Sequence, residues 1–307
     1  MKLEGIHHVT AITGDAPGNV DFYTRVLGLR LVKKSVNQDD PTVYHLFYAD
    51  ERGSAGSDIT FFEYPGARRG RAGRGMVHTV VWRVGSTEAV DFWQERLTRE
   101  GLDVARDGDR LTFADPEGLG LEIRLVATAD EPLVAVHPEI PAELAIQGFD
   151  GVRAYTGDTD ASRAFLTDTL GFGADGETAF EVRGDRRGSF YAYDEIAQTG
   201  WPGAGTVHHV AWASLPEEHE AWRQQVAEGG GRPTDVIDRY YFKSIYFREP
   251  SGVLFEIATI GPGFTTDEDI EHLGERLALP PAYEHLREQV EQLVTPLPNP
   301  RADWAVR

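Results

Sequence analysis

The sequence predicts an α+β protein of four βαβββ modules that form two domains. Three observations lead to this prediction. The chain carries a fourfold internal repeat, each repeat has the pattern of one strand, one helix and three further strands, and two His-His pairs occupy equivalent places in two of the repeats. With 307 residues, the chain can bury one large core or two ordinary ones.

One pair of matching segments joins the two halves of the chain. Residues 11–15 (AITGD) resemble residues 154–158 (AYTGD), and residues 22–29 resemble residues 165–172 at the same offset and without a gap. Because both matches keep one register, chance explains them poorly.

A second pair of matches relates the remaining repeats. Residues 77–82 (VHTVVW) resemble residues 207–212 (VHHVAW), and the turn sequence DPEG at 115–118 resembles EPSG at 249–252. Each module therefore begins with a β-branched strand, continues with a helix that ends near a glycine, and closes with three strands separated by turns. The modules span 4–66, 76–127, 146–195 and 204–260, with helices expected at 16–27, 86–100, 160–170 and 216–228, and helix-ending glycines at Gly28, Gly101, Gly171 and Gly229.

The modules predict a division into two domains. Residues 1–128 hold the first two modules, and residues 146–262 hold the last two, with a linker rich in Ala, Glu and Pro at 129–145. Residues 263–307 form a C-terminal extension, in which residues 283–293 have helical spacing before a run of prolines.

Composition excludes several classes of function. The formal net charge of −20 argues against nucleic-acid binding, since no basic stripe offsets phosphate repulsion. The chain has no cysteine, which rules out disulfides, iron–sulfur clusters and thiolate zinc sites. No stretch approaches 18 consecutive apolar residues, and the N-terminus has no apolar signal region. We therefore expect a cytoplasmic protein without membrane partners, whose metal ligands would be histidines and carboxylates.

Two His-His pairs and one glutamate are the candidate metal ligands. His7-His8 and His208-His209 each begin a predicted strand, and Glu256 lies inside an apolar third strand. A lone histidine in a strand is usually an ordinary core residue, but two pairs at equivalent places are harder to explain in that way. A buried, unpaired carboxylate costs several kcal/mol and needs a cation or a proton. Two imidazoles and one carboxylate match a facial triad with open coordination positions.

Comparison of the modules separates the two histidines of each pair. Neighbouring strand residues face opposite sides, so one histidine per pair is expected to face the metal. His209 is replaced by Thr79 in the second module, although the preceding histidine is kept there as His78. His8 is replaced by Gly151 in the third module. We therefore expect His8 and His209 to be the ligands, in one site between the first and fourth modules.

Two further glutamates complete the comparison. Glu122 keeps the carboxylate in the second module, so an equivalent but vacant site is expected between the second and third modules. Glu63, near the end of the first module, is a candidate fourth ligand, although it could equally be an exposed side chain.

The chain resembles the vicinal oxygen chelate superfamily, which includes glyoxalase I, fosfomycin- and bleomycin-resistance proteins and extradiol dioxygenases. Its closer resemblance is to the hydroquinone ring-cleaving dioxygenases, such as 2,6-dichlorohydroquinone 1,2-dioxygenases. The resemblance is found mainly in residues 5–10 (GIHHVT), 207–212 and 244–259 (SIYFREPSGVLFEIAT), and it extends over about residues 4–265. Extradiol catechol dioxygenases draw their ligands from the third and fourth modules, and Gly151 argues against that arrangement here.

The resemblance implies two glyoxalase-like domains with curved mixed sheets enclosing a metal cavity. It also implies an Fe(II) cofactor and a small aromatic substrate that reacts with O₂. The Fe(II) ligands would be His8, His209 and Glu256. The surrounding active-site residues would be His7, Thr10, His208, Arg239 and Tyr246.

The residue types suit those roles. Arg239 could stabilise negative charge on the substrate, or could form a surface ion pair with Asp235 or Asp238. Tyr246 could donate a hydrogen bond to a substrate oxygen, or be an ordinary strand aromatic. His7 or His208 could act as a general acid or base near neutral pH.

Two other functions stay open at this point. A glyoxalase-type isomerase or lyase would need a fourth protein ligand, which Glu63 would have to supply. A metal-free small-molecule-binding resistance protein would use the histidines as core residues. Facial triads also accept Mn²⁺ or Zn²⁺, and neither the ring substituents nor homo-oligomerisation follow from the sequence.

Overall fold

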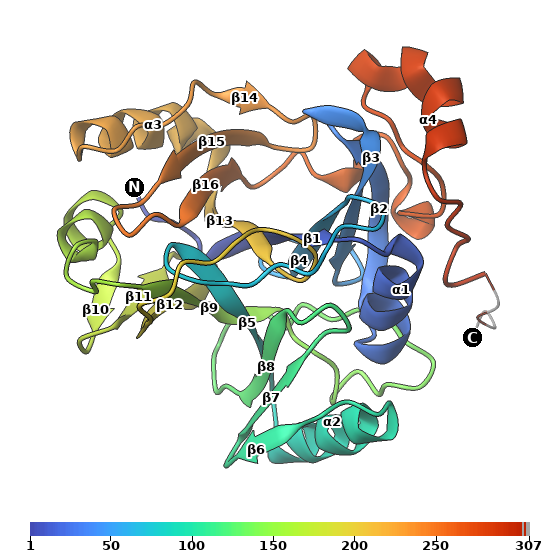
Figure 1. The fold of residues 1–307 in the computed structure, drawn as a ribbon, viewed down its shortest axis with the longest axis horizontal. Helices are drawn as coiled ribbons and strands as arrows, with labels where there is room; N and C mark the ends of the chain where they lie inside the picture. Colours follow the sequence, from blue (N-terminus) through green and yellow to red (C-terminus); the bar gives the residue numbers. More distant parts are fainter. Residues whose placement is uncertain (303, 305–307) are drawn as a thin grey trace.

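The chain folds into two curled, eight-stranded mixed sheets accompanied by few helices (Figure 1). The structure is a computed structural model, and it describes residues 1–302 and 304. Each of the four predicted modules is present as one strand, a helical segment and three further strands, so the α+β prediction with four βαβββ modules is confirmed. None of the helices in these described residues is long and apolar enough to cross a membrane.

The elements follow one another in the same order in each module. The first comprises β1 (Ile6–Thr13), α1 (Ala16–Val20), η1 (Asp21–Val26), β2 (Arg30–Asn37), β3 (Asp40–Ala49) and β4 (Asp58–Glu63). The second comprises β5 (Met76–Val84), α2 (Thr87–Arg99), β6 (Ala105–Asp107), β7 (Arg110–Ala114) and β8 (Gly120–Leu125). The third comprises β9 (Phe149–Thr156), η2 (Phe165–Thr169), β10 (Gly173–Asp175), β11 (Ala179–Arg183) and β12 (Gly188–Glu195). The fourth comprises β13 (Val207–Ser214), η3 (Pro216–Glu218), α3 (His219–Glu228), β14 (Ile237–Asp238), β15 (Lys243–Arg248) and β16 (Leu254–Thr259).

Capping residues and glycines delimit the helices. The side chains of Asp15 and Ser86 accept hydrogen bonds from backbone N–H groups in the first turns of α1 and α2, which satisfies otherwise unpaired donors. Gly28, Gly101 and Gly171 have positive φ angles after their helices, as predicted. The prediction for Gly229 was wrong by one residue, since the neighbouring Gly230 adopts the left-handed conformation (φ 89°).

The modules pair first with fourth and second with third. One sheet has the order β14-β15-β16-β13-β1-β4-β3-β2, and the other has the order β10-β11-β12-β9-β5-β8-β7-β6. In the centre of each sheet, the first strands of two modules run antiparallel, β1 beside β13 and β5 beside β9. Both His-His pairs are therefore in the same sheet.

Two crossing segments carry the chain between the sheets. Residues 68–74 leave the first module and pair with residues 198–204, which lead into the fourth, through reciprocal backbone hydrogen bonds such as Arg71–Trp201 (2.9 Å). At the closest approach, a Cβ atom on Gly73 would lie 2.1 Å from the backbone nitrogen of Gly200. Only glycine fits at these two positions.

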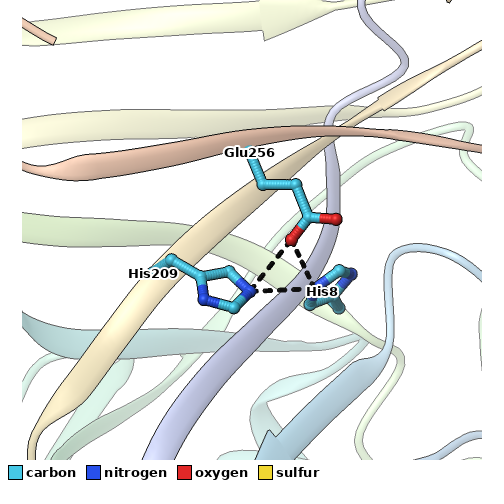
Figure 2. Close-up of side chains that lie close together, drawn as sticks. All are labelled: His8, His209 and Glu256. Atoms are coloured by element: carbon cyan, nitrogen blue, oxygen red, sulfur yellow. Dashed lines mark hydrogen bonds and ion pairs between the residues drawn. The ribbon is translucent and has the colours of Figure 1, made fainter. Parts of the chain in front are cut away.

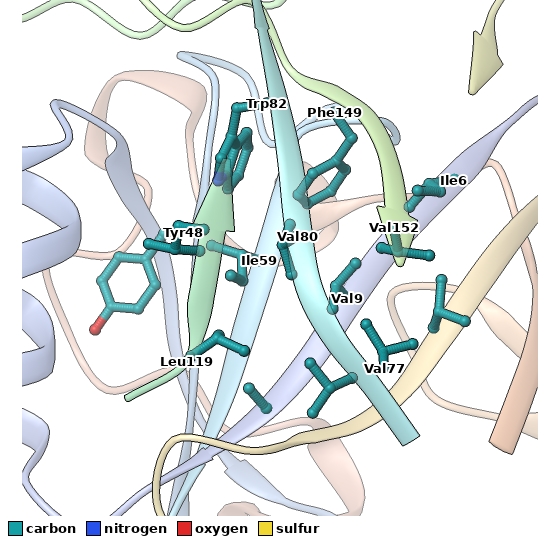
Figure 3. Close-up of a cluster of buried hydrophobic side chains, with 14 of the residues drawn as sticks. Ile6, Val9, Tyr48, Ile59, Val77, Val80, Trp82, Leu119, Phe149 and Val152 are labelled. Carbon is teal, nitrogen blue, oxygen red and sulfur yellow. The ribbon is translucent and has the colours of Figure 1, made fainter. Parts of the chain in front are cut away.

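The two faces of the first sheet have different surroundings. Val9 and Ile59 belong to the main hydrophobic core and point toward Val80 and Val152 of the second sheet (Figure 3). Because side chains alternate along a strand, His8 and Thr10 project from the opposite, concave face. The same alternation places Thr60 of β4 on that face, and it is there that the candidate site forms.

The C-terminal extension is held against the first sheet. It contains η4 (Phe264–Thr266), η5 (Ile270–His272), η6 (Pro281–Leu286) and α4 (Arg287–Leu293), the last two of which match the predicted helical segment, while residues 303 and 305–307 lie outside the described part. The fully buried ammonium group of Lys33 on β2 forms ion pairs with Asp267 (2.7 Å) and Glu268. Asp267 also accepts a hydrogen bond from the hydroxyl of Tyr241 (2.9 Å), a residue of the site cavity.

Candidate metal centre

Three side chains from three adjacent strands converge at the concave face (Figure 2). Nε2 of His8 on β1 lies 3.2 Å from Nε2 of His209 on β13. Oε2 of Glu256 on β16 lies 3.1 Å from the first nitrogen and 2.9 Å from the second. The side chains are 2%, 4% and 0% exposed, so water does not separate or screen these groups.

The triangle has the dimensions of one face of an octahedron. Metal–ligand bonds of about 2.1 Å at right angles place the donor atoms about 3.0 Å apart, whereas tetrahedral angles place them about 3.4 Å apart. Two of the edges, 2.9 and 3.1 Å, are nearer the octahedral value, and the third, 3.2 Å, lies midway between the two. The donor set therefore fits a divalent cation with three further positions available.

The charges also favour a cation. Burial acts to raise the pKa of Glu256, but His8 and His209 outweigh it and hold the pKa well below its usual range. Burial lowers the pKa of His209, despite the attraction of Glu256. Both Glu256 oxygens are buried without a hydrogen-bond donor, and no lysine or arginine of the described residues pairs with them. An ionised carboxylate in such surroundings is costly unless a cation lies beside it.

A β-bulge occurs at the first histidine of each pair. In the β1–β13 register, Ile6 faces Trp212 and His8 faces Ala211, so His7 is the extra residue. The β13 strand bulges in the same way at His208. A bulge re-aims the side chain of the extra residue. Each extra histidine can therefore reach around to its neighbour, although simple alternation would separate the two rings.

His7 sets the proton position on His8. Nε2 of His7 lies 3.2 Å from the carbonyl oxygen of Thr259, which can only accept, so this nitrogen carries the proton. Burial, followed by the proximity of His8, lowers the pKa of His7 to about 3, so the ring is neutral and its Nδ1 accepts. Nδ1 of His8 lies 2.9 Å away and must donate. The lone pair on Nε2 of His8 is thereby directed at the triangle.

His208 holds a parallel position on the other strand. Its Nδ1 lies 2.8 Å from Nδ1 of His209. The residue is exposed by surface area, and burial of its ring, followed by the proximity of His209, lowers its pKa to about 4. Neither His7 nor His208 lines the cavity in front of the triangle.

A narrow cavity, with about 40 Å³ of space for water-sized molecules, lies in front of the triangle. Tyr246 lines it, facing Glu256 across the β15–β16 register, and burial, followed by the charge of Glu256, raises the pKa of its hydroxyl. Arg239 also lines it, with Nε 3.4 Å from the Tyr246 hydroxyl. The remaining wall residues are His8, Ser35, Val36, Asn37, Gln38, Asp39, His45, Phe47, Phe62, His209, Tyr241 and Phe242.

Arg239 has an ion-pair partner that the sequence did not indicate. Its guanidinium nitrogens lie 2.9 and 3.1 Å from the carboxylate of Asp39, in the turn between β2 and β3. The alternative partners predicted from sequence, Asp235 and Asp238, are not the ones used. This pair joins the first and fourth modules across the mouth of the cavity.

The register between first and last strands corrects the interpretation of Glu63. Ala211 lies beside Glu256 in the fourth module, and the equivalent residue of the first module, Thr10, lies beside Thr60. Thr60, rather than Glu63, therefore occupies the position of Glu256. Glu63 lies at the far end of β4, where its Oε1 accepts a hydrogen bond from the backbone of Ala16 (3.3 Å), and it is not part of the cluster.

Comparison with known proteins agrees with this architecture. Residues 5–123 and 148–257 match the model of the Glyoxalase/Bleomycin resistance protein/Dioxygenase superfamily. The chain belongs to this superfamily. The resemblance predicted from the sequence is thus confirmed.

Relatives in the superfamily carry the names of ring-cleaving enzymes. The chain is 40% identical to MhqA of Bacillus subtilis (strain 168), which is provisionally named a ring-cleaving dioxygenase, over 97% of this chain and all of MhqA. It is 33% identical to the chlorohydroquinone/hydroquinone 1,2-dioxygenase of Sphingobium indicum, over 94% of this chain and 95% of that protein. A crystal structure of a provisionally named dioxygenase from Bacillus subtilis superposes with a TM-score of 0.89 at 40% identity, covering 96% of this chain and 98% of that one.

The second sheet has different residues at the positions equivalent to the three candidate ligands. In the second sheet Thr79 and Gly151 stand where the first sheet has His209 and His8, and Glu122 stands where it has Glu256. The predicted vacancy is partly filled, because a Cβ on Gly151 would lie 2.4 Å from the ring of Phe190. Nε of Arg153 lies 3.6 Å from Glu122 and supplies the positive charge. A guanidinium thus neutralises the carboxylate there.

Asp58 is a second buried carboxyl group on the concave face. It lies beside His8 in the β1–β4 register, and neither of its oxygens has a hydrogen-bond donor. Burial, followed by the proximity of Asp50, raises its pKa well above the usual range. A protonated Asp58 adds no second negative charge on the β-strand beside His8.

We expect Asp58→Asn to flatten the dependence of stability on pH. A carboxyl group whose pKa is raised by folding stabilises the native state fully below its unfolded pKa, near 4, and progressively less as pH rises toward the folded pKa. The wild type should therefore lose stability above about pH 4 relative to the variant. Urea unfolding of the chelator-treated protein at a series of pH values measures this.

Asp160→Asn, at an exposed aspartate, is the matched control and should keep the wild-type slope. If Asp58→Asn also keeps that slope, Asp58 is ionised in the folded protein and the interpretation fails.

Proposed function

We propose that the protein is an Fe(II)-dependent ring-cleaving dioxygenase that acts on hydroquinone-type aromatic diols with O₂. The observation that carries the proposal is the triangle of His8, His209 and Glu256, whose donor atoms lie 2.9–3.2 Å apart and which no fourth metal-binding side chain joins among the described residues. Such a triad leaves positions for both a substrate oxygen and O₂. The 33% identical relative named a chlorohydroquinone/hydroquinone 1,2-dioxygenase supports the choice of substrate class.

When bound, the metal would supply adjacent positions for a phenolate oxygen of the substrate and for O₂, and a path for electrons between them. The chain's own groups would do the rest. Tyr246 faces Glu256 and, with a raised pKa, stays protonated and can donate a hydrogen bond to the bound substrate oxygen. Arg239 carries a permanent positive charge beside that hydroxyl and stabilises negative charge on the ring.

His7 acts on the site through His8. Its bond to the Thr259 carbonyl fixes the protonated nitrogen and, through it, the lone pair of His8. His208 lies against Nδ1 of His209 and reaches solvent, so it is suited to move a proton between His209 and water. Thr10 lies behind the site, with its hydroxyl 2.8 Å from that of Thr60.

The competing functions have less support. A glyoxalase-type site needs a fourth protein ligand, and the equivalent position holds Thr60, whose hydroxyl is engaged by His45 (2.8 Å) and Thr10. A metal-free binding protein would need a proton on one of the two imidazoles to balance the buried, ionised Glu256. Mn²⁺ or Zn²⁺ would fit the same donors. Zn²⁺ is not redox-active, and iron is proposed over manganese from the resemblance to the Fe(II)-dependent ring-cleaving dioxygenases.

We further propose that residues 1–128 and 146–262 are the two domains, joined by residues 129–145. The division is supported by the two separate stretches of the superfamily match, 5–123 and 148–257. Each of the two sheets nevertheless takes strands from both domains, so the proposed metal site depends on their association.

Oxygen uptake is the direct test of the reaction. After anaerobic loading with Fe(II), the protein should consume one O₂ per hydroquinone and give a ring-opened product that contains both oxygen atoms. Catechol should be consumed more slowly. An oxygen electrode combined with mass spectrometry of products made from ¹⁸O₂ measures both. Absence of uptake with every hydroquinone and catechol in a panel would refute the dioxygenase proposal.

His8→Ala and His7→Ala should have different effects on iron. Removal of His8 takes away a donor of the triangle, so bound iron should fall below detection at equimolar metal. Removal of His7 keeps the three donors, but the His8 ring is no longer held in its orientation. The affinity for Fe(II) should therefore fall about 10–100-fold, while one iron ion per chain still binds at saturation. Anaerobic Fe(II) titration followed by metal analysis distinguishes these results.

The matched control is His78→Ala. His78 occupies the place of His7 in the second sheet, hydrogen bonding to Thr79 (2.9 Å) and Asp194 (3.0 Å) far from the triangle. The His78→Ala substitution should leave Fe(II) binding unchanged. Loss of iron in His7→Ala at saturation, with iron retained in His8→Ala, would reverse the assignment of ligands.

A further inference from the structure

His45 is a histidine of the cavity wall that the sequence comparison did not single out. It lies on β3, two strands from β1 in the same sheet, since β4 separates them. It lines the cavity together with His8 and His209 but is not one of the converging donors. Adjacent strands are about 4.8 Å apart, so His45 stands on the wall across the cavity from the proposed metal.

The ring of His45 is held in one orientation. Its Nε2 lies 2.8 Å from the hydroxyl of Thr60, which in turn lies 2.8 Å from the hydroxyl of Thr10. The ring also packs against Phe47 and Phe62, with centroids 3.9 and 4.4 Å away. One ring nitrogen is thus occupied by the protein. Nδ1 has no hydrogen-bond partner among residues 1–302 and 304.

The ring is neutral in this position. Burial, followed by the proximity of His8, His209 and Arg239, lowers the pKa of His45 well below its usual range, despite the opposing effect of Glu256. A neutral imidazole can offer Nδ1 as donor or acceptor, depending on how the Thr60 hydroxyl points. It can therefore pair with either a phenol or a phenolate.

Several other polar groups of the cavity are already engaged. The Gln38 amide donates to the carbonyl of Arg239 (2.8 Å), the Asn37 amide oxygen accepts from the backbone of Asp39 (3.0 Å), and Tyr241 donates to Asp267. Ser35 lies directly across from His45 in the β2–β3 register. Its buried hydroxyl approaches that of Tyr241 but makes no close hydrogen bond among the described residues.

We propose that His45, assisted by Ser35, binds the hydroxyl group of the substrate that does not reach the metal. This inference rests on the proposed function. The two oxygens of a 1,2-diol lie on one edge of the ring and can both reach one metal, whereas those of a 1,4-diol lie at opposite ends. A second hydroxyl buried without a partner would cost binding energy. His45 and Ser35 would thereby select 1,4-diols.

Anaerobic binding of two ligands to the Fe(II)-loaded protein tests this without turnover. Hydroquinone and phenol differ only in the remote hydroxyl. The wild type should bind hydroquinone roughly tenfold more tightly than phenol, the usual worth of one well-placed hydrogen bond. In His45→Phe the ratio of the two dissociation constants should fall to about one, with phenol affinity retained. Calorimetry under argon gives both constants.

Two further variants separate recognition from packing. His45→Asn keeps a polar group near the position of Nδ1 and should restore part of the preference for hydroquinone. Thr60→Val removes the partner of Nε2, together with the hydrogen bond to Thr10, and should reduce the preference without abolishing phenol binding. Iron stoichiometry and thermal unfolding of each variant show that the site is intact.

The outcomes are distinguishable. Retention of the tenfold ratio in His45→Phe, or an equal loss of affinity for both ligands, would overturn the role of His45. A wild type that binds both ligands with equal affinity would also overturn it, without touching the proposed reaction. A wild type that binds neither ligand would instead contradict the proposed function itself.

Discussion

Glu256 places an ionised carboxylate, 0% exposed, between two imidazoles, and much of the first sheet is arranged around that charge. Neither carboxylate oxygen receives a hydrogen bond, and the lone pair of His8 is directed at the same point. Three electron-rich atoms within 3.2 Å of one another repel unless a cation or a proton lies between them. The proposed metal would thus stabilise this arrangement as well as supply its chemistry.

The second sheet shows another solution to the same problem. Glu122 is as deeply placed as Glu256, yet Arg153 lies beside it and Phe190 fills the space of an absent histidine. The same module therefore occurs in two forms. In the second sheet the Arg153 guanidinium lies beside the buried carboxylate, and in the first sheet the metal-binding donor atoms have no such partner. The bulge at His78 matches those at His7 and His208, which indicates that the bulge belongs to the module and not to the proposed chemistry.

The sequence predicted the parts of this account that depend on pattern within a module. The four βαβββ units, the pairing of the first with the fourth, and the grouping of His8, His209 and Glu256 all follow from unequal repeats. The residue at the fourth-ligand position could not be predicted in this way. The sequence match suggested Glu63, and only the strand register shows that Thr60 occupies the position equivalent to Glu256. His45 and Asp39 were missed since they reach the cavity through sheet curvature and a hairpin turn, which leave no local signal. The bulges were missed because one extra strand residue does not change the apolar pattern.

Diffraction at the iron absorption edge tests the central claim most directly. Crystals of the Fe(II)-loaded protein should show one anomalous peak per chain, about 2.0–2.3 Å from Nε2 of His8, Nε2 of His209 and Oε2 of Glu256. No peak should appear beside Glu122. A peak in the second sheet, or none at the first site under saturating Fe(II), would contradict the account.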